Sequence, residues 1–164
     1  MKRFILLLLP LAMFAASDLV KEVRHELVTL PYYGVFDNLA YRVDGSKVTL
    51  FGQVRDPKLK IDAEKAVKSI EGVSAVDSQI EVLPLSPADD STRMAVYRAI
   101  YTKPSLQRYQ LGAVPPIHII VRNGDVTLEG VVANQMDKEV AGIAAKGVGS
   151  THQVTNNLRA DTGK

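Results

Sequence analysis

The residues that could carry out chemistry are few and widely spaced. The 164-residue chain has three histidines, His25, His118 and His152, and no cysteine. No histidine is spaced from other polar residues as metal ligands or a catalytic base require. The segment 147–151 resembles a phosphate-binding glycine loop, but it lacks the lysine and follows a predicted helix instead of preceding one. We therefore predict a protein that is not an enzyme and that holds no metal and no cofactor.

A basic stretch that contains tyrosines indicates binding instead of catalysis. Between Asp90 and Asp125 the chain has five basic residues and no acidic one. Tyrosine beside arginine suits a membrane interface, because the ring is apolar and its tip is polar. Val96 and Ile100 are expected to face the core from a helix, which leaves their basic and aromatic neighbours outside. The predicted lipid-binding residues are Arg93, Tyr97, Arg98, Tyr101, Lys103 and Arg108. The alternative is a solvated helix whose tyrosines pack against the long loop 103–116.

The N-terminal segment has the three-part pattern of a secretory signal. Lys2 and Arg3 precede an apolar run, and small residues follow at Ala15, Ala16 and Ser17. The run is shorter than the roughly 20 residues that a membrane-spanning helix needs. We predict a cleavable signal peptide at residues 1–17 and a periplasmic protein, with an uncleaved anchor as the alternative.

The net charge of +2 depends on this segment. Loss of Lys2 and Arg3 would leave 18 basic and 18 acidic residues, and therefore a neutral protein. Proteins that bind nucleic acids normally carry a strong basic excess. Nucleic acid is therefore excluded as a partner.

An internal repeat defines the domain organisation. Residues 48–54 reappear as residues 126–132, at an offset of 78, and matching apolar positions follow each copy. The segment 84–88 contains two prolines and no charge, which is typical of a short connector. We predict domains at 18–83 and 89–160, joined by a linker at 84–88.

Each repeat is predicted to have the order αββαβ. A helix at 18–27 precedes a hairpin with its turn at Asp44–Gly45, because apolar residues alternate on both sides of that turn. A second helix follows, and an alternating strand closes the repeat. The helix is expected to begin with Asp56 as its cap and Pro57 in its first turn, and to present these residues to the core: Leu59, Ala63, Ala66 and Ile70.

The second repeat has the same pattern. Its first helix is predicted to begin with Asp89 or Asp90 as the cap, and its hairpin turns at Asn123–Gly124. Its second helix is expected to begin after Asn134, to end at Gly147 and to face the core with Met136, Val140 and Ile143. The predicted fold class is α+β, with two αββαβ repeats that each form a small mixed sheet packed by two helices.

Four glycines are predicted to have structural roles. Gly45 and Gly124 lie in the predicted turns. Gly52 and Gly130 lie at matching points of the second hairpin strand, where a glycine usually marks a bulge or a closely packed backbone. We expect a helix that crosses the sheet to need that space.

Two motifs of the second repeat resemble the BON domain: the residues 126–130 (VTLEG) and 154–158 (VTNNL). In the first repeat the second motif has changed to residues 76–80 (VDSQI). The resemblance covers nearly the whole chain after the predicted signal, as two copies, and is similar to the arrangement in periplasmic, osmotically inducible members of the family.

This resemblance implies a non-enzymatic envelope protein that associates with anionic phospholipid surfaces, in envelope maintenance or the response to osmotic stress. Some relatives are lipoproteins, but this chain has no cysteine to carry a lipid. The competing interpretation is a protein-interaction or chaperone-like envelope adaptor without direct lipid binding, because open sheet edges can accept an added strand.

Overall fold

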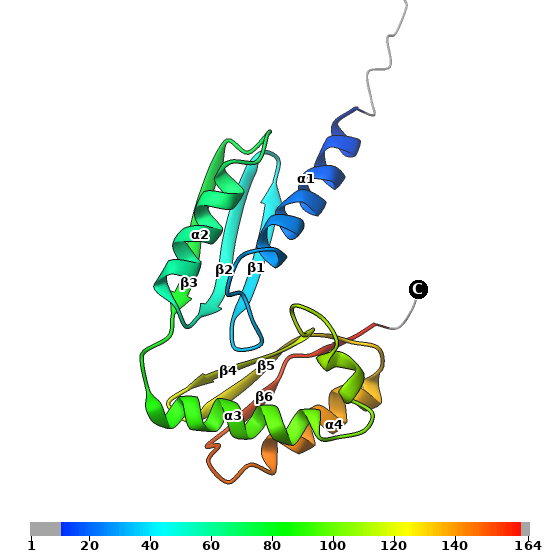
Figure 1. Cartoon of the computed structure of the whole chain (residues 1–164). Helices are drawn as coiled ribbons and strands as arrows, with labels where there is room; N and C mark the ends of the chain where they lie inside the picture. The colour runs from blue at the N-terminus through cyan, green and yellow to red at the C-terminus, as the bar shows by residue number, and fades with distance from the viewer. Residues whose placement is uncertain (1–10, 162–164) are drawn as a thin grey trace, which may run out of the picture.

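The computed structural model describes residues 11–161, which form two small α+β units that follow one another along the chain. Figure 1 shows the first unit above the second, each with two helices beside a twisted sheet. The predicted fold class, with two αββαβ repeats, is confirmed. Most of the predicted signal segment lies outside the described residues. Within residues 11–161, no helix is both long enough and apolar enough to cross a membrane.

The first repeat contains α1 (Leu11–Val28), β1 (Asn38–Asp44), β2 (Lys47–Val54), α2 (Pro57–Lys68) and β3 (Ala75–Val82). Helix α1 begins before the predicted start at residue 18, so a continuous helix crosses the predicted cleavage position. Helix α2 begins as predicted, because the Asp56 side chain accepts a hydrogen bond from the Lys58 backbone N–H at 2.8 Å. Its buried face includes Val67 in place of the expected Ala66.

The second repeat contains α3 (Pro87–Tyr101), the 3-10 helix η1 (Gln107–Gln110), β4 (Ile117–Arg122), β5 (Asp125–Val132), α4 (Gln135–Lys146), β6 (Val154–Asn156) and β7 (Arg159–Ala160). The predicted cap of its first helix is wrong. Ser86 caps α3, since its hydroxyl accepts a hydrogen bond from the Asp89 backbone N–H at 3.1 Å. Asp89 is buried instead and accepts hydrogen bonds from the backbone N–H groups of Asn123 and Gly124, both at 2.9 Å.

The two sheets have the same topology. In the first sheet β2 lies between antiparallel β1 and parallel β3, and in the second sheet β5 lies between antiparallel β4 and the parallel strands β6 and β7. The hairpin register is also shared, because Tyr41 pairs with Leu50 and Ile119 pairs with Leu128. Residues of β1 therefore have direct equivalents 78 positions later in β4.

The closing strand differs between the repeats. Strand β3 is continuous, whereas its equivalent is interrupted between β6 and β7. At the interruption the Asn156 side chain donates to the Lys138 carbonyl at 2.7 Å and accepts from the Leu158 backbone N–H at 3.2 Å. Leu158 remains fully buried. The Asn156 side chain therefore supplies hydrogen bonds where the strand is interrupted, and Leu158 keeps its place in the core.

The predicted core face of α4 is correct only for Val140, which packs against the core, and is wrong for Met136 and Ile143. Met136 and Ile143 are 71% and 70% exposed, while the buried residues of this helix are mainly small: Asp137, Ala141, Gly142, Ala144 and Ala145. Small side chains let α4 lie close to the sheet and to α3, and Met136 and Ile143 face solvent. The Asn134 cap and the end at Gly147 are as predicted.

Gly52 and Gly130 occupy equivalent, unusual backbone positions. Their φ angles are +119° and +121°, a region that residues with a side chain rarely adopt. A Cβ atom at Gly52 would lie 2.0 Å from the Asn38 carbonyl oxygen, and one at Gly130 would lie 1.9 Å from the Pro116 carbonyl oxygen. The close neighbour is thus the backbone of the partner strand, not the helix that the sequence led us to expect. Gly45 and Gly124 lie in the hairpin turns.

Candidate binding surfaces

The structure separates the residues of the predicted lipid-binding surface into buried and exposed groups. Arg93 and Tyr101 are only 2% and 4% exposed, so the prediction that they lie on the outer side of their helix is wrong. Arg93 lies three residues before Val96 and shares its inward face. Its guanidinium donates to Asp90 at 2.7 Å and to the Val121 carbonyl at 2.6 Å. Burial raises the pKa of the Tyr101 hydroxyl, which donates to the Ile117 carbonyl at 3.3 Å.

These two buried side chains cover the outer edge of the second sheet. Arg93 and Tyr101 both bond to carbonyl groups of β4, which is an edge strand. Between them, the Ile119 backbone N–H donates to the Val35 carbonyl of the first repeat at 2.7 Å. Unpaired backbone groups at a sheet edge attract other strands. The roles of Arg93 and Tyr101 in this structure are therefore to close an edge.

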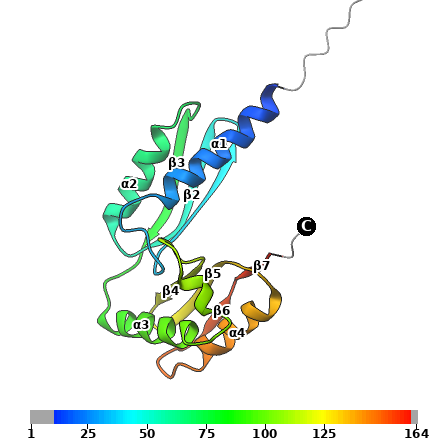
Figure 2. The same ribbon diagram turned by 45° about the vertical axis from the view of Figure 1, so that its right-hand side comes forward.

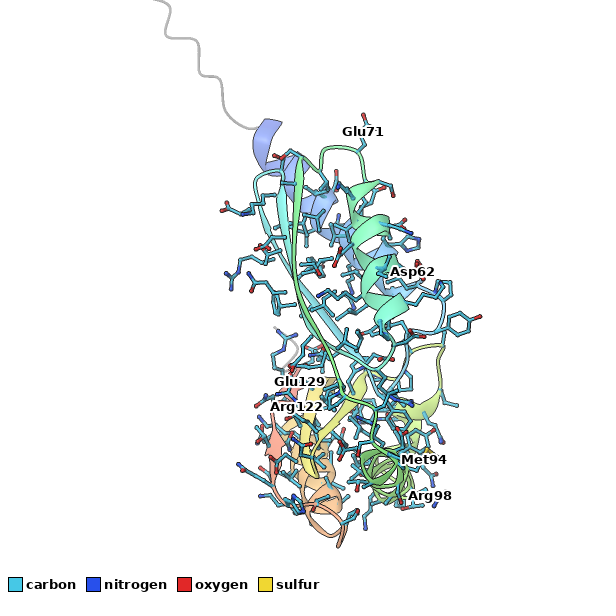
Figure 3. The ribbon with its side chains drawn as sticks, turned by 90° about the vertical axis from the view of Figure 1, so that its left-hand side faces the viewer. Asp62, Glu71, Met94, Arg98, Arg122 and Glu129 are labelled. Carbon is cyan, nitrogen blue, oxygen red and sulfur yellow. The ribbon has the colours of Figure 1, made fainter. Side chains whose placement is uncertain are left out.

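The other predicted residues lie nearer to solvent. Arg98 and Lys103 are exposed, and Figure 3 shows Arg98 on the side of α3 that faces away from the sheet. Arg108 is exposed, but its guanidinium forms an ion pair with the carboxylate of Asp137, which neutralises its charge locally. Tyr97 is half-buried, and its hydroxyl accepts a hydrogen bond from the Gln110 side chain at 2.7 Å, as the alternative with loop-packed tyrosines expects.

Sequence reasoning missed the apolar part of this exposed region. Met94 on α3 is 41% exposed, and it lies beside Arg98 in Figure 3. Helices α3 and α4 pack against each other, so the exposed Met136 and Ile143 belong to the same helical layer. We call Met94, Arg98, Lys103, Met136 and Ile143 the α3–α4 surface. The signal that could have revealed it is the second, alanine-rich stripe of α4, which competes with the Met136–Ile143 stripe for the core.

A separate cluster lies where the repeats meet, in the loop between α1 and β1. The Tyr33 ring stacks on the His118 ring, with centroids 5.4 Å apart and planes at 17°. Phe36 packs edge-on against Tyr97, at 6.1 Å between centroids. In return, Val114 of the second repeat packs against the core of the first. The repeats therefore share apolar contacts in both directions.

Polar groups at this junction bring opposite charges together. Nη2 of Arg55 lies 3.3 Å from Oδ1 of Asp90, and Arg122 forms an ion pair with Glu81. Asp37 accepts a hydrogen bond from the Arg55 backbone N–H at 2.8 Å, and burial raises the pKa of its carboxyl. The junction thus combines ring stacking with ion pairs that are about half exposed.

Among the three histidines, His118 is the buried one. His25 and His152 are exposed, whereas His118 lies in strand β4 and is only 8% exposed. Its Nδ1 lies 3.3 Å from the Gly34 carbonyl oxygen, and its Nε2 lies 3.5 Å from the Tyr33 hydroxyl. Desolvation lowers the pKa of the His118 imidazole and raises the pKa of Tyr33 to about 12. Both rings are thus held in their neutral forms.

A cleft of about 930 Å³ opens between the two repeats. One wall is the Asn38–Tyr41 part of β1 together with the end of α1, and the other includes Glu129 of β5 and Arg159 of β7. Within residues 11–161, no group of three histidine or acidic residues is arranged to hold a metal ion. The cleft has walls that are partly apolar and partly polar, as is usual for ligand-binding sites.

Taken together, the fold and these surfaces define a protein with two tandem binding modules. The BON-domain family model matches residues 15–84 and 89–162, so the chain belongs to the BON-domain family and contains two copies of the domain. BON domains are non-catalytic binding domains, and membership of this family supports an envelope-associated protein.

Comparisons with individual proteins are less informative. No curated protein matches the chain. A solved structure of the C-terminal domain of CdsD, the structural protein of the type III secretion system of Chlamydia trachomatis, is 13% identical, with a TM-score of 0.31, and the match covers 87% of this chain and 97% of that one. A second CdsD structure is 12% identical, with a TM-score of 0.30, covering 86% and 91%. Similarity at this level supports no functional conclusion.

Proposed function

We propose that the protein binds anionic phospholipid at the surface of an envelope membrane through the α3–α4 surface of its second repeat. The observation that carries this proposal is the combination of exposed Arg98 and Lys103 with the exposed apolar side chains of Met94, Met136 and Ile143. Charge near the headgroups and apolar side chains just below them are the two requirements of an interfacial surface.

The strength of this binding follows from the number of groups available. Each basic residue close to an anionic surface contributes about 1 kcal/mol. Of the six predicted residues, Arg98 and Lys103 remain as exposed charges without a carboxylate partner among residues 11–161, since Arg93 is buried and Arg108 is bonded to Asp137. Two charges alone hold a protein weakly, so the apolar side chains must supply the rest. We expect reversible, salt-sensitive binding.

Co-sedimentation with vesicles tests the proposal directly. The full chain is mixed with vesicles of pure phosphatidylcholine or with added phosphatidylglycerol, at low and high salt. We expect binding to the anionic vesicles only, and weaker binding at high salt because ions screen the attraction. Equal binding to both vesicle types, or binding to neither, would contradict the proposal.

Two double variants localise the surface. Arg98→Glu with Lys103→Glu should abolish binding to anionic vesicles. Lys65→Glu with Lys68→Glu makes the same change of charge on exposed positions of α2 in the first repeat, and it should leave binding nearly unchanged. An equal loss in both variants would show that net charge matters and the α3–α4 surface does not.

The proposal includes the route to the membrane and the domain boundaries. Residues 1–17 act as a cleavable signal that delivers the protein to the periplasm, and the linker at 84–88 joins domains at 18–83 and 89–160. N-terminal sequencing of the protein from the periplasmic fraction should begin at Asp18. The binding serves envelope maintenance under osmotic stress, which a deletion strain grown at high osmolarity would test.

A further inference from the structure

The outer edges of the two sheets can be compared group by group. In an antiparallel strand the backbone groups of alternate residues point to opposite sides. The Leu39 backbone N–H donates to the Tyr33 hydroxyl at 3.3 Å, so the backbone N–H and C=O groups of Leu39 point away from β2. By alternation, the backbone groups of Tyr41 and Val43 also point away from β2. The equivalent residues of β4 are Ile117, Ile119 and Val121.

The two edges differ in what covers them. On β4, three outward backbone groups have partners. The Tyr101 hydroxyl donates to the Ile117 carbonyl, and the Arg93 guanidinium donates to the Val121 carbonyl. Between them, the Ile119 N–H donates to the Val35 carbonyl. On β1, the structure of residues 11–161 provides one such partner, the Tyr33 hydroxyl at Leu39, and none for the outward backbone groups of Tyr41 and Val43. The first sheet therefore ends in an open edge.

The reason lies in two positions of the first helix. Val23 and Leu27 of α1 match Val96 and Ile100 of α3 as fully or almost fully buried core residues. When the two helices are aligned on these core residues, Val20 of α1 is equivalent to Arg93 of α3, and Val28 is equivalent to Tyr101. Valine has no polar side-chain group, so neither residue can hydrogen-bond to the strand edge, and the two valines are 41% and 42% exposed. The repeat thus lacks the two side chains that close the other edge.

The open edge also borders the cleft between the repeats. Four consecutive residues of β1, Asn38 to Tyr41, line the cleft, together with Val28 of α1. Phe51 and Val131, which are 36% and 39% exposed, contribute further apolar surface. Figure 1 shows β1 at the rim of the first sheet, on the side of α1. The cleft therefore reaches Tyr41, whose outward backbone groups are unpaired within residues 11–161, and continues over β2 and β3 at Phe51 and Gln79, while Val43 lies beyond its lining.

We propose that the β1 edge binds an extended segment of a partner polypeptide as an added strand, with apolar side chains of that segment at alternate positions against Val28 and its neighbours. Backbone hydrogen bonds to Tyr41 and Val43 supply affinity, and the cleft supplies selectivity for side chains. This site lies on the first repeat and does not depend on the membrane surface proposed for the second.

A peptide fits this edge better than a second copy of the chain. If two β1 strands paired antiparallel around Tyr41, the Arg42 side chains of the two copies would be diagonal neighbours on one face of the joined sheet. Like charges at such positions are unfavourable. A peptide without charge at that position avoids this repulsion.

A tethered strand tests the proposal at high local concentration. The full chain is extended after residue 164 by a flexible Gly/Ser linker and the sequence Thr-Val-Thr-Val-Thr, since Arg159 near the chain end lines the cleft. Amide hydrogen exchange is then followed by NMR. We expect the Tyr41 and Val43 amides to exchange roughly tenfold more slowly than in the unextended chain. The Ala40 and Arg42 amides already point toward β2 and should not change.

Matched variants determine whether the edge is responsible. A Thr-Pro-Thr-Pro-Thr tail cannot pair as a strand and should give no protection. Val20→Arg with Val28→Tyr copies the cover of β4 and should remove the protection, whereas Val82→Arg on the opposite edge strand β3 should not. Protection that survives the double variant, or no protection of Tyr41 and Val43 with the first tail, would overturn the proposal. Protection that grows with the concentration of the unextended chain would also overturn it, in favour of pairing between two copies.

Discussion

Repeat 1 and repeat 2 share the sheet topology and the hairpin register, but different side chains surround their first strands. In repeat 2 the buried Arg93 and Tyr101 bond to the outer edge of β4, whereas in repeat 1 the equivalent helix presents valines and leaves the edge of β1 open. The exposed apolar residues Met136 and Ile143 lie on the second helix of repeat 2. The comparison shows that one scaffold supports two kinds of binding surface, an open strand edge in one copy and an exposed helical layer in the other.

The largest change in stability is expected at Gly52 and Gly130, the equivalent strand glycines of the two repeats. Gly52→Ala and Gly130→Ala each place a Cβ within about 2 Å of a backbone oxygen at a strained φ angle. Each should lower the free energy of unfolding by about 2–4 kcal/mol, measured by urea denaturation. Gly149→Ala is the control, because its Cβ would meet no atom within 4 Å. A large loss at only one of the two strand glycines would show that the repeats are not equivalent in this respect.

A smaller change in the free energy of unfolding is expected from variants that distinguish the closed edge of β4 from the open edge of β1. Arg93→Met keeps most of the side-chain volume but leaves the Val121 carbonyl without its buried partner. We expect a loss of about 1–3 kcal/mol in the free energy of unfolding. Val20→Arg, at the equivalent position of repeat 1, should change stability by less than about 0.5 kcal/mol. Similar losses in both variants would contradict the distinction between a closed and an open edge.

The junction between the repeats should weaken in acid. Burial lowers the pKa of folded His118 below its ordinary value of 6.5, so the unfolded chain binds more protons between these two values. The stability due to neutral His118 is thus fully present above pH 6.5 and decreases as the pH falls below it. The surrounding groups are Tyr33, which is neutral here, together with Asp37 and Glu129.

Urea denaturation at pH 7.5 and 6.0 measures this effect, and His118→Gln should reduce the difference between the two pH values. Asp37 acts in the opposite direction, because burial raises its pKa above the ordinary value of 3.8 and its contribution increases as the pH falls. His118→Gln leaves Asp37 in place, so the difference between variant and parent reports His118 alone. An unchanged pH dependence in the variant would exclude His118 as its source.

The smallest effect is expected at the ion pair that bridges the repeats. Glu81 and Arg122 are about half exposed, so Glu81→Gln should cost less than about 1 kcal/mol, and nothing measurable at high salt. Glu71→Gln, at the far end of the first repeat in Figure 3, is the matched control. A clearly larger cost would mean that charge, more than the Tyr33–His118 stack, holds the repeats together.

The helical arrangement of each repeat is also visible in Figure 2, where α1 and α2 lie beside the first sheet and α3 and α4 beside the second. Most of this arrangement could be predicted, because alternating residues around Gly45 and Gly124 and the 78-residue offset are local or repeated signals. The candidate surfaces could be predicted only in part. Arg98 and Lys103 are exposed as expected, but Arg93 and Tyr101 are not.

The amino-acid sequence by itself determined the number of repeats, the order of their elements, the positions of the hairpins and the family. These depend on periodicity and turn residues, which act over a few positions. The tertiary structure decided which face of α4 is buried, since alanines pack more closely than Met136 and Ile143. It also decided the role of Arg93, whose acceptor at Val121 lies 28 residues away in the chain. Such choices depend on contacts between distant segments, so local patterns do not reveal them.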